Sequence, residues 1–191
     1  MAGRPEGLLY QPDFLTVDEE QDLVSTFEDL TFSEVRMHGQ PARRTVAHFG
    51  VRYDYESYRL TPTDPLPAEL EWLRDRAAAL AEVPPEAVAE TLVTRYPAGA
   101  GIGWHRDAPM FGPRVVGVSL LSPCRIRFQR GKGEVRQVFD LELEPRSAYV
   151  IGGAARSAWQ HSIPSTKGLR YSVTFRTVRK PKGARSSLVF V

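Results

Sequence analysis

The chain has 191 residues, of which 42% are hydrophobic and 25% charged, and its formal net charge is +2. This is the composition of a single globular domain with a core of its own. No apolar run is long enough to span a bilayer, and the segment 1–10 is too short and too polar for a signal peptide. Because Cys124 is the only cysteine, no internal disulfide can form, and we expect a monomeric cytoplasmic protein without a membrane partner.

Two helices are predicted in the first half of the chain. Residues 16–19, Thr-Val-Asp-Glu, match a capping box, in which the threonine hydroxyl and the glutamate carboxylate cap each other's backbone amides. Apolar residues then recur at helical spacing and predict a helix over about 17–30. A second helix begins near Pro67, a residue favoured in a first turn, and ends at Pro84-Pro85.

From about Glu90 onward the sequence is typical of short strands separated by Gly, Pro or charged turns. The predicted strands are Thr91–Tyr96, Arg114–Leu121, Arg125–Arg130, Val135–Leu141, Ala148–Ile151 and Arg170–Val178. Helices followed by many strands indicate an α+β protein, with the helices covering one side of an antiparallel double-sheet barrel or jelly roll. We expect one domain over 1–179, with its jelly-roll core at 90–179, and a basic tail at 180–191.

A candidate metal site comes from two of the four histidines and one aspartate. His105 and Asp107 point to the same side of an extended segment, and His161 would reach them from a distant strand. Two histidines and one carboxylate are the ligand set of non-haem Fe(II) oxygenases. Two alternatives remain open from these residues alone. One is a zinc hydrolase, and the other is a surface hydrogen-bonded pair beside an unrelated core histidine.

The last predicted strand alternates between polar and apolar residues. Its polar face consists of Arg170, Ser172, Thr174 and Arg176. If this face is buried, the charges need a partner, and a dicarboxylate matches the two guanidinium groups. The alternative is that the face is simply exposed to solvent.

Several motifs in this order resemble the AlkB-type Fe(II)/2-oxoglutarate dioxygenases. The resemblance covers roughly residues 91–179, and the earlier stretch 43–53 also resembles the segment that precedes the core in several members. The matching motifs are Arg95-Tyr96-Pro97-Ala98-Gly99-Ala100, Trp104-His105-Arg106-Asp107, Gly117-Val118-Ser119-Leu120, His161 and Arg170-Tyr171-Ser172-Val173-Thr174-Phe175-Arg176. The fold it implies is a double-stranded β-helix, the jelly roll of these enzymes, with the N-terminal helices packed on one sheet.

The resemblance also implies roles for individual residues. His105, Asp107 and His161 would hold Fe(II), and O₂ would be the second substrate. Arg170 would bind the distal carboxylate of 2-oxoglutarate, with Arg176 supporting its other end. Further cosubstrate contacts are implied for Tyr96, Thr94 and Ser172. Many members have Asn in place of Thr94 and of Ser172, and these smaller polar groups are expected to retain binding with an altered affinity.

The substrate expected from the resemblance is nucleic acid with an alkylated base, either single-stranded or with the base flipped out. Residues 31–60 match the nucleotide-recognition lid of the family by position. Within them Arg43 and Arg44 are phosphate candidates, and Phe49 and Tyr53 are candidates for stacking on the base. The competing interpretation is an amphipathic hairpin whose aromatic residues pack on the core.

The function predicted from the sequence is oxidative demethylation of N-alkylated bases in DNA or RNA, as in DNA repair, with release of formaldehyde, succinate and CO₂. The alternatives are an oxygenase that modifies transfer RNA or protein, and a non-catalytic jelly-roll binding module. No acidic residue occurs at 108–112, where some DNA-repair members carry one for base selection, so the sequence leaves the base open.

Overall fold

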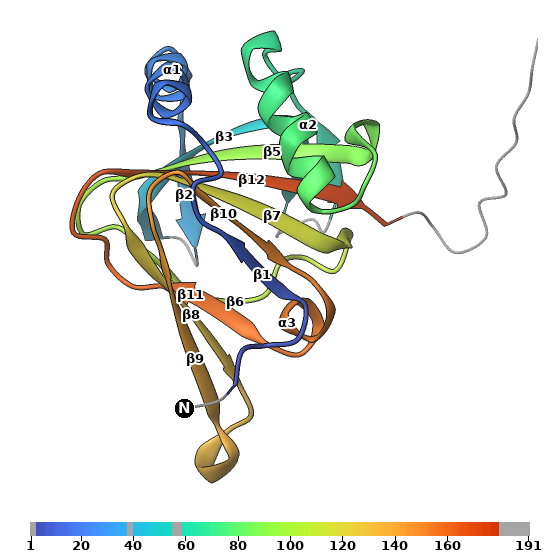
Figure 1. Cartoon of the computed structure of the whole chain (residues 1–191), viewed down its shortest axis with the longest axis vertical. Coiled ribbons are helices and arrows are strands. Elements are labelled where there is room, and N and C mark those ends of the chain that lie inside the picture. Colours follow the sequence, from blue (N-terminus) through green and yellow to red (C-terminus); the bar gives the residue numbers. More distant parts are fainter. Residues whose placement is uncertain (1–2, 38–39, 55–58, 180–191) are drawn as a thin grey trace, which may run out of the picture.

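A computed structural model describes residues 3–37, 40–54 and 59–179. Two antiparallel sheets face each other, and two helices cover the outer side of the larger sheet (Figure 1). In the described residues the larger sheet has the strand order β1-β10-β7-β12-β5-β3-β2, with β4 paired to β3, and the smaller sheet has the order β6-β11-β8-β9. This is the two-sheet arrangement that the strand pattern predicted.

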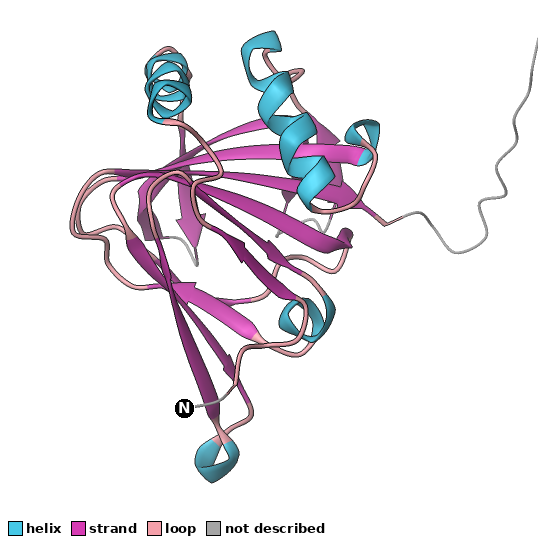
Figure 2. Ribbon diagram, in the orientation of Figure 1, coloured by secondary structure: helices cyan, strands magenta, loops and turns pink. Residues whose placement is uncertain are grey.

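The strands and helices have the following bounds. The strands are β1 Leu8–Gln11, β2 Ser33–Met37, β3 Gln40–Asp54, β4 Arg59–Pro62, β5 Val88–Tyr96, β6 Ile102–His105, β7 Phe111–Leu121, β8 Cys124–Arg130, β9 Gln137–Leu143, β10 Ser147–Ile151, β11 Gln160–Ile163 and β12 Arg170–Val178. The α-helices are α1 Val17–Glu28, α2 Glu71–Leu80 and α3 Gly153–Ser157, and short 3₁₀ turns occupy Ala68–Leu70, Pro85–Ala87 and Gly133–Val135 (Figure 2).

The main core lies between the larger sheet and the helices. Because side chains alternate along a strand, Tyr171, Val173 and Phe175 of β12 all point to this side. Leu23 and Phe27 of α1 pack into the same cluster, and so do Leu73 and Ala77 of α2. Among the described residues no helix is both long and apolar enough to cross a membrane.

The predicted capping box is present at the start of α1. The Thr16 hydroxyl accepts a hydrogen bond from the Glu19 amide at 3.1 Å, and a Glu19 carboxylate oxygen accepts one from the Thr16 amide at 2.9 Å. Arg76 of α2 donates to both oxygens of the Glu19 carboxylate at 2.9 and 2.6 Å. The residue that caps α1 therefore also ties the two helices together on the sheet.

The segment 31–60, predicted as a lid, forms strands in its described part. β3 pairs with β5 over Thr45–Gly50, and β2 and β4 pair with β3, so this segment widens the larger sheet beside the cavity. The rest of the segment, and the predicted tail 180–191, lie outside the described residues.

Candidate active site

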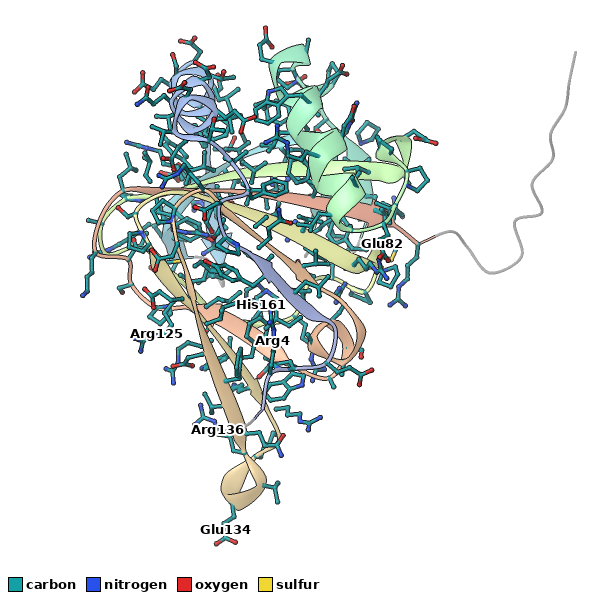
Figure 3. All side chains as sticks on the ribbon, viewed as in Figure 1. Arg4, Glu82, Arg125, Glu134, Arg136 and His161 are labelled. Atoms are coloured by element: carbon teal, nitrogen blue, oxygen red, sulfur yellow. The ribbon has the colours of Figure 1, made fainter. Side chains whose placement is uncertain are left out.

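A cavity of about 160 Å³ lies between the inner faces of the two sheets. A single water molecule needs a cavity of roughly 10–15 Å³. This cavity is therefore large enough for a ligand of several atoms. The larger sheet contributes residues of β3, β5, β7 and β12, and the smaller sheet contributes residues of β6, β8 and β11. Figure 3 shows His161 between the sheets, whereas Glu134 and Arg136 lie at the far tip of the β8–β9 arm, which consists of β8, β9 and the turn between them.

The three predicted metal ligands meet at this cavity. His105 at the end of β6 is paired across the strands with His161 of β11, and their ring centroids are 4.3 Å apart. Asp107 follows β6 by two residues, and its Oδ2 lies 3.8 Å from His161 Nε2. Strand pairing thus brings together residues that are more than fifty positions apart in the sequence.

The chemistry of these three groups fits a divalent metal. His105 Nδ1 lies 2.8 Å from the Gly103 carbonyl oxygen, a contact that orients the ring and leaves Nε2 for a metal. Asp107 Oδ2 is buried and accepts no hydrogen bond. Burial lowers the pKa of His161 to about 4, so its ring is neutral at pH 7, as a ligand must be. Within the described residues no group of three or more His, Cys, Asp or Glu side chains is spaced to hold a metal ion, so the three candidates lie close together without forming a metal centre.

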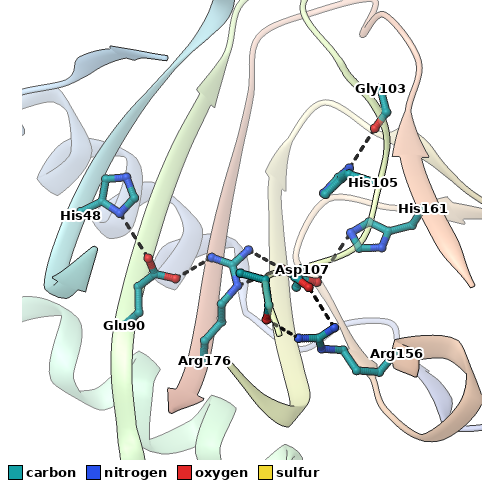
Figure 4. Close-up of polar contacts among 9 residues, drawn as sticks. His48, Glu90, Gly103, His105, Asp107, Arg156, His161 and Arg176 are labelled. Atoms are coloured by element: carbon teal, nitrogen blue, oxygen red, sulfur yellow. Dashed lines mark hydrogen bonds and ion pairs between the residues drawn. The ribbon is translucent and has the colours of Figure 1, made fainter. Parts of the chain in front are cut away.

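Arg176 anchors the aspartate from β12. Its Nε and Nη2 donate to Asp107 Oδ1 at 2.9 and 2.6 Å, and its Nη1 donates to Glu90 Oε2 at 2.6 Å (Figure 4). Burial opposes the ionisation of Asp107, but the surrounding positive charges, Arg176 foremost, together outweigh it and hold the pKa of Asp107 well below its usual range. The carboxylate is therefore ionised and held in one orientation.

Two residues of this network were missed by the sequence analysis. Arg156 of α3 donates to the backbone carbonyl oxygens of Asp107 and Ala108 at 3.1 and 2.8 Å, which fixes the turn that carries the aspartate. Glu90, 1% exposed, faces Arg176 across the β5–β12 pair. Its position on the polar face of the predicted strand, in step with Thr94 and Tyr96, is the pattern that could have indicated it.

Arg170 is fully buried beneath the cavity. Its Nη2 donates to the Ser119 hydroxyl at 2.9 Å, and its guanidinium carbon lies 5.1 Å from the centre of the Tyr96 ring. The Nε and Nη1 groups have no hydrogen-bond partner. A buried cation with two unused donors is unfavourable unless an anion supplies the missing acceptors, and a carboxylate does so with both oxygens.

The other predicted cosubstrate residues lie on the same surface. Thr94 of β5 and Ser172 of β12 are cross-strand partners, and both line the cavity together with Tyr96. The polar face of β12 is thus turned into the protein, and the alternative of a solvent-exposed strand face was wrong.

The four predicted substrate residues separate in the structure. Arg44 is buried and lines the cavity, with Nη1 3.5 Å from the Gly101 carbonyl oxygen, whereas Arg43 is exposed on the same strand. Tyr53 lines the cavity and packs edge-on against Phe111, with ring centroids 6.1 Å apart.

Phe49 does not reach the cavity. It is 8% exposed and belongs to the core cluster between the larger sheet and the helices, on the opposite face of β3 from Arg44. The prediction that Phe49 stacks on a base was therefore wrong, because its position along β3 turns the side chain toward the helices and away from the cavity.

Comparisons with known proteins agree with this geometry. The family model described as the 2OG-Fe(II) oxygenase superfamily matches residues 7–190. A solved structure, that of OsALKBH1, superposes with a TM-score of 0.71 at 17% identity, covering 93% of this chain and 99% of that one. This likeness shows the shared fold.

Similar sequences include named AlkB homologues. "Alkylated DNA repair protein ALKBH8 homolog" from Arabidopsis thaliana is 27% identical over 84% of this chain and 51% of its own length. "tRNA (carboxymethyluridine(34)-5-O)-methyltransferase ALKBH8" from Macaca fascicularis is 26% identical over 92% of this chain and 31% of its own length. A protein of Acanthamoeba polyphaga mimivirus, L905, is 27% identical over 93% of this chain and 88% of its own length.

The chain thus spans about half of the plant relative and about a third of the macaque one. The family model, by contrast, matches nearly all of it. The chain belongs to the 2OG-Fe(II) oxygenase superfamily and is an AlkB-type dioxygenase that depends on Fe(II), 2-oxoglutarate and O₂.

Proposed function

We propose that this enzyme oxidatively demethylates N-alkylated bases in nucleic acid. The observation that carries the proposal is the cavity between the two sheets. It combines the three metal-ligand candidates with the buried cation Arg44 and the aromatic wall at Tyr53. The relatives named for alkylated-DNA repair and for transfer RNA support nucleic acid as the substrate class.

His105, Asp107 and His161 are the residues proposed to hold Fe(II). When bound, the metal supplies the oxidising chemistry that activates O₂ at the expense of 2-oxoglutarate. Arg176 and Arg156 keep Asp107 and its turn in place, and the contact of His105 with Gly103 keeps the imidazole oriented toward the metal position.

Arg170 is proposed to bind the distal carboxylate of 2-oxoglutarate through its unused Nε and Nη1 donors. Tyr96, Thr94 and Ser172 provide hydroxyl groups along the cosubstrate, and Arg176 supports the end nearest the metal. Because these groups come from the paired strands β5 and β12, they hold a fixed geometry before the cosubstrate enters.

The overall reaction balances as follows. One atom of O₂ enters succinate, as 2-oxoglutarate loses CO₂, and the other is inserted into a C–H bond of the N-methyl group. The resulting N-hydroxymethyl base then breaks its C–N bond to give formaldehyde, and the base nitrogen keeps the hydroxyl proton. The protein's part is to direct the methyl group into the cavity beside His105 and His161.

The same cavity admits a base only from a single strand or after flipping. We assign Tyr53 to packing against that base and Arg44 to a polar contact inside the cavity, because both line it. Arg43, exposed on the same strand, is the candidate for a phosphate contact outside.

The second candidate function is modification of transfer RNA, favoured by the names of the vertebrate relatives. A substrate panel decides between them: alkylated single-stranded DNA, the same sequence in RNA, total transfer RNA and histone peptide, each with iron and 2-oxoglutarate. Formaldehyde released in step with succinate on DNA or RNA supports the proposal. Release on peptide alone would contradict it.

A further inference from the structure

His48 is a histidine of this cavity that the reaction described so far does not use. It lies on β3, on the inner face with Arg44 and Val46, and it lines the cavity. Its side chain is 21% exposed, whereas that of its neighbour Glu90 is 2% exposed. His48 is therefore accessible from the cavity, while its contact with Glu90 is shielded from solvent.

A continuous line of polar contacts joins His48 to the metal-ligand candidates. His48 Nδ1 lies 3.3 Å from Glu90 Oε1, and Arg176 Nη1 donates to Glu90 Oε2 at 2.6 Å. Arg176 in turn binds Asp107, and Figure 4 shows Glu90 and Arg176 lying between His48 and the aspartate. Each oxygen of the Glu90 carboxylate thus faces a different partner.

This arrangement determines which nitrogen of His48 carries a proton. Burial opposes the ionisation of Glu90, but the charge and hydrogen bond of Arg176 and the contact with His48 together outweigh it and keep the pKa of Glu90 below its usual value. An ionised carboxylate only accepts hydrogen bonds, so His48 Nδ1 must be the donor. In the neutral ring this is the only N–H group, and Nε2 is left with its lone pair as an acceptor.

We propose that His48 is a specificity-determining residue that presents Nε2 to the substrate as a hydrogen-bond acceptor. Glu90 is the positioning residue that fixes this tautomer. An acceptor on the wall of the cavity favours a base that presents an exocyclic amine to it over one that presents a carbonyl. The identity of the substrate rests on the proposed function, whereas the tautomer does not.

Glu90→Gln separates this proposal from a merely structural role. A glutamine has one acceptor oxygen, and the charged Arg176 is the stronger donor, so the amide oxygen faces Arg176 and the NH₂ group faces His48. His48 Nδ1 must then accept, and the proton moves to Nε2. The substitution converts the group facing the cavity from an acceptor to a donor while keeping the shape of the side chain.

The tautomer is read directly from long-range ¹H–¹⁵N spectra of histidine-labelled, metal-free protein at pH 8, with His48→Phe used to assign the signals. We expect the wild type to have a protonated Nδ1 and an unprotonated Nε2, and Glu90→Gln to have the reverse. A protonated Nε2 in the wild type, or the same tautomer in both proteins, would overturn the proposal. The wild-type spectrum alone decides it if Glu90→Gln does not fold.

The consequence for specificity is measured with one single-stranded oligonucleotide carrying either 3-methylcytosine or 3-methyluracil. These bases have an amine or a carbonyl at C4, and the former also carries a positive charge, which is the same for every enzyme variant compared. We expect Glu90→Gln to lower the ratio of kcat/KM for the two substrates by about tenfold or more, and His48→Phe to lower it as well. The control Glu134→Gln, at the remote tip of the β8–β9 arm, should leave the ratio unchanged (Figure 3).

A ratio that stays constant in Glu90→Gln and in His48→Phe would overturn the specificity role even if the tautomer changes. If the wild type removes neither methyl group, the proposed function fails. The nitrogen spectra would then still test the role of Glu90 as a positioning residue.

Discussion

Arg176 binds one oxygen of Asp107 and leaves the other free for a metal. Its Nε and Nη2 both donate to Oδ1, at 2.9 and 2.6 Å, while Oδ2 faces His161 Nε2 at 3.8 Å. Because Oδ2 is buried and accepts no hydrogen bond, the carboxylate has one anchored oxygen and one available oxygen. This division explains how a buried aspartate stays ionised while one of its oxygens remains open toward His161, as the proposed metal site requires.

Replacing His105 tests whether this residue is a metal ligand. His105→Ala should reduce iron-dependent succinate formation to background and lower the iron content of the purified protein. Because the ring is only partly buried, we expect the free energy of unfolding to change by less than about 1 kcal/mol. Retained turnover in a protein with normal iron content would remove His105 from the ligand set.

Replacing Arg170 tests the cosubstrate site. Arg170→Ala removes the two unused donors beneath the cavity, and the loss of charge-assisted hydrogen bonds should raise the KM for 2-oxoglutarate by about 10- to 100-fold. Arg170→Lys keeps the positive charge but lacks the planar guanidinium group that binds both carboxylate oxygens. Its KM for 2-oxoglutarate should lie between those of the wild type and the alanine variant. An unchanged KM in Arg170→Ala would place the distal carboxylate elsewhere.

The two aromatic residues of β3 should behave differently. Tyr53→Ala should lower formaldehyde release more than succinate release, because the cavity wall is lost and the substrate is no longer held. Phe49→Ala should cost about 3–5 kcal/mol of stability, since it removes a buried core side chain, and should leave the ratio of the two products unchanged. If Phe49→Ala keeps the wild-type stability but releases less formaldehyde relative to succinate, Phe49 belongs to the substrate site after all.

The contact between the two helices should make stability depend on pH. The hydrogen bonds from Arg76 and from the Thr16 amide lower the pKa of Glu19 from 4.5 to about 2. A depressed carboxyl pKa stabilises the folded state above pH 4.5, and this contribution is lost as the pH falls from 4.5 to about 2.

The contribution of this partly exposed pair is at most about 1 kcal/mol. Thermal unfolding of the wild type and of Glu19→Gln between pH 2 and 7 measures it. We expect the difference between the two proteins to be largest at neutral pH and to vanish near pH 2. A difference that is constant across this range would show that the carboxylate charge does not act in this way.

The β-rich half of the fold and the common face of His105 and Asp107 were predictable because they depend on local patterns. The alternation of β12 placed Arg170 and Arg176 on one face, and the short motif around His105 placed Asp107 two residues away on the same side. Pairing of β6 with β11 brings His161 to them. The sequence predicted that His161 would come from a distant strand but could not specify which one.

The substrate side was less predictable, and Gly50 gives the physical reason. Phe49 and Tyr53 are four residues apart and would share one face of a regular strand, yet Phe49 faces the helices and Tyr53 the cavity. Gly50 lies between them with a left-handed φ of 82°, a conformation at which the alternation of a strand changes face.

Glu90 and Arg156 escaped prediction for a related reason. Their roles depend on which residues stand opposite them in the folded chain. Glu90 acquires its role from cross-strand pairing with Arg176, and Arg156 from carbonyl groups nearly fifty positions earlier. The period of two along the strand indicates the face on which Glu90 lies, but no local period in the sequence encodes the partner of Glu90 or of Arg156.

The most direct test of the proposed function is the mass of a single-stranded DNA carrying 3-methylcytosine after incubation with the enzyme. We predict the loss of one CH₂ unit only when Fe(II), 2-oxoglutarate and O₂ are all present, with no loss in His105→Ala. Succinate formation without any change in the mass of alkylated DNA or RNA would contradict the assignment of nucleic acid as the substrate.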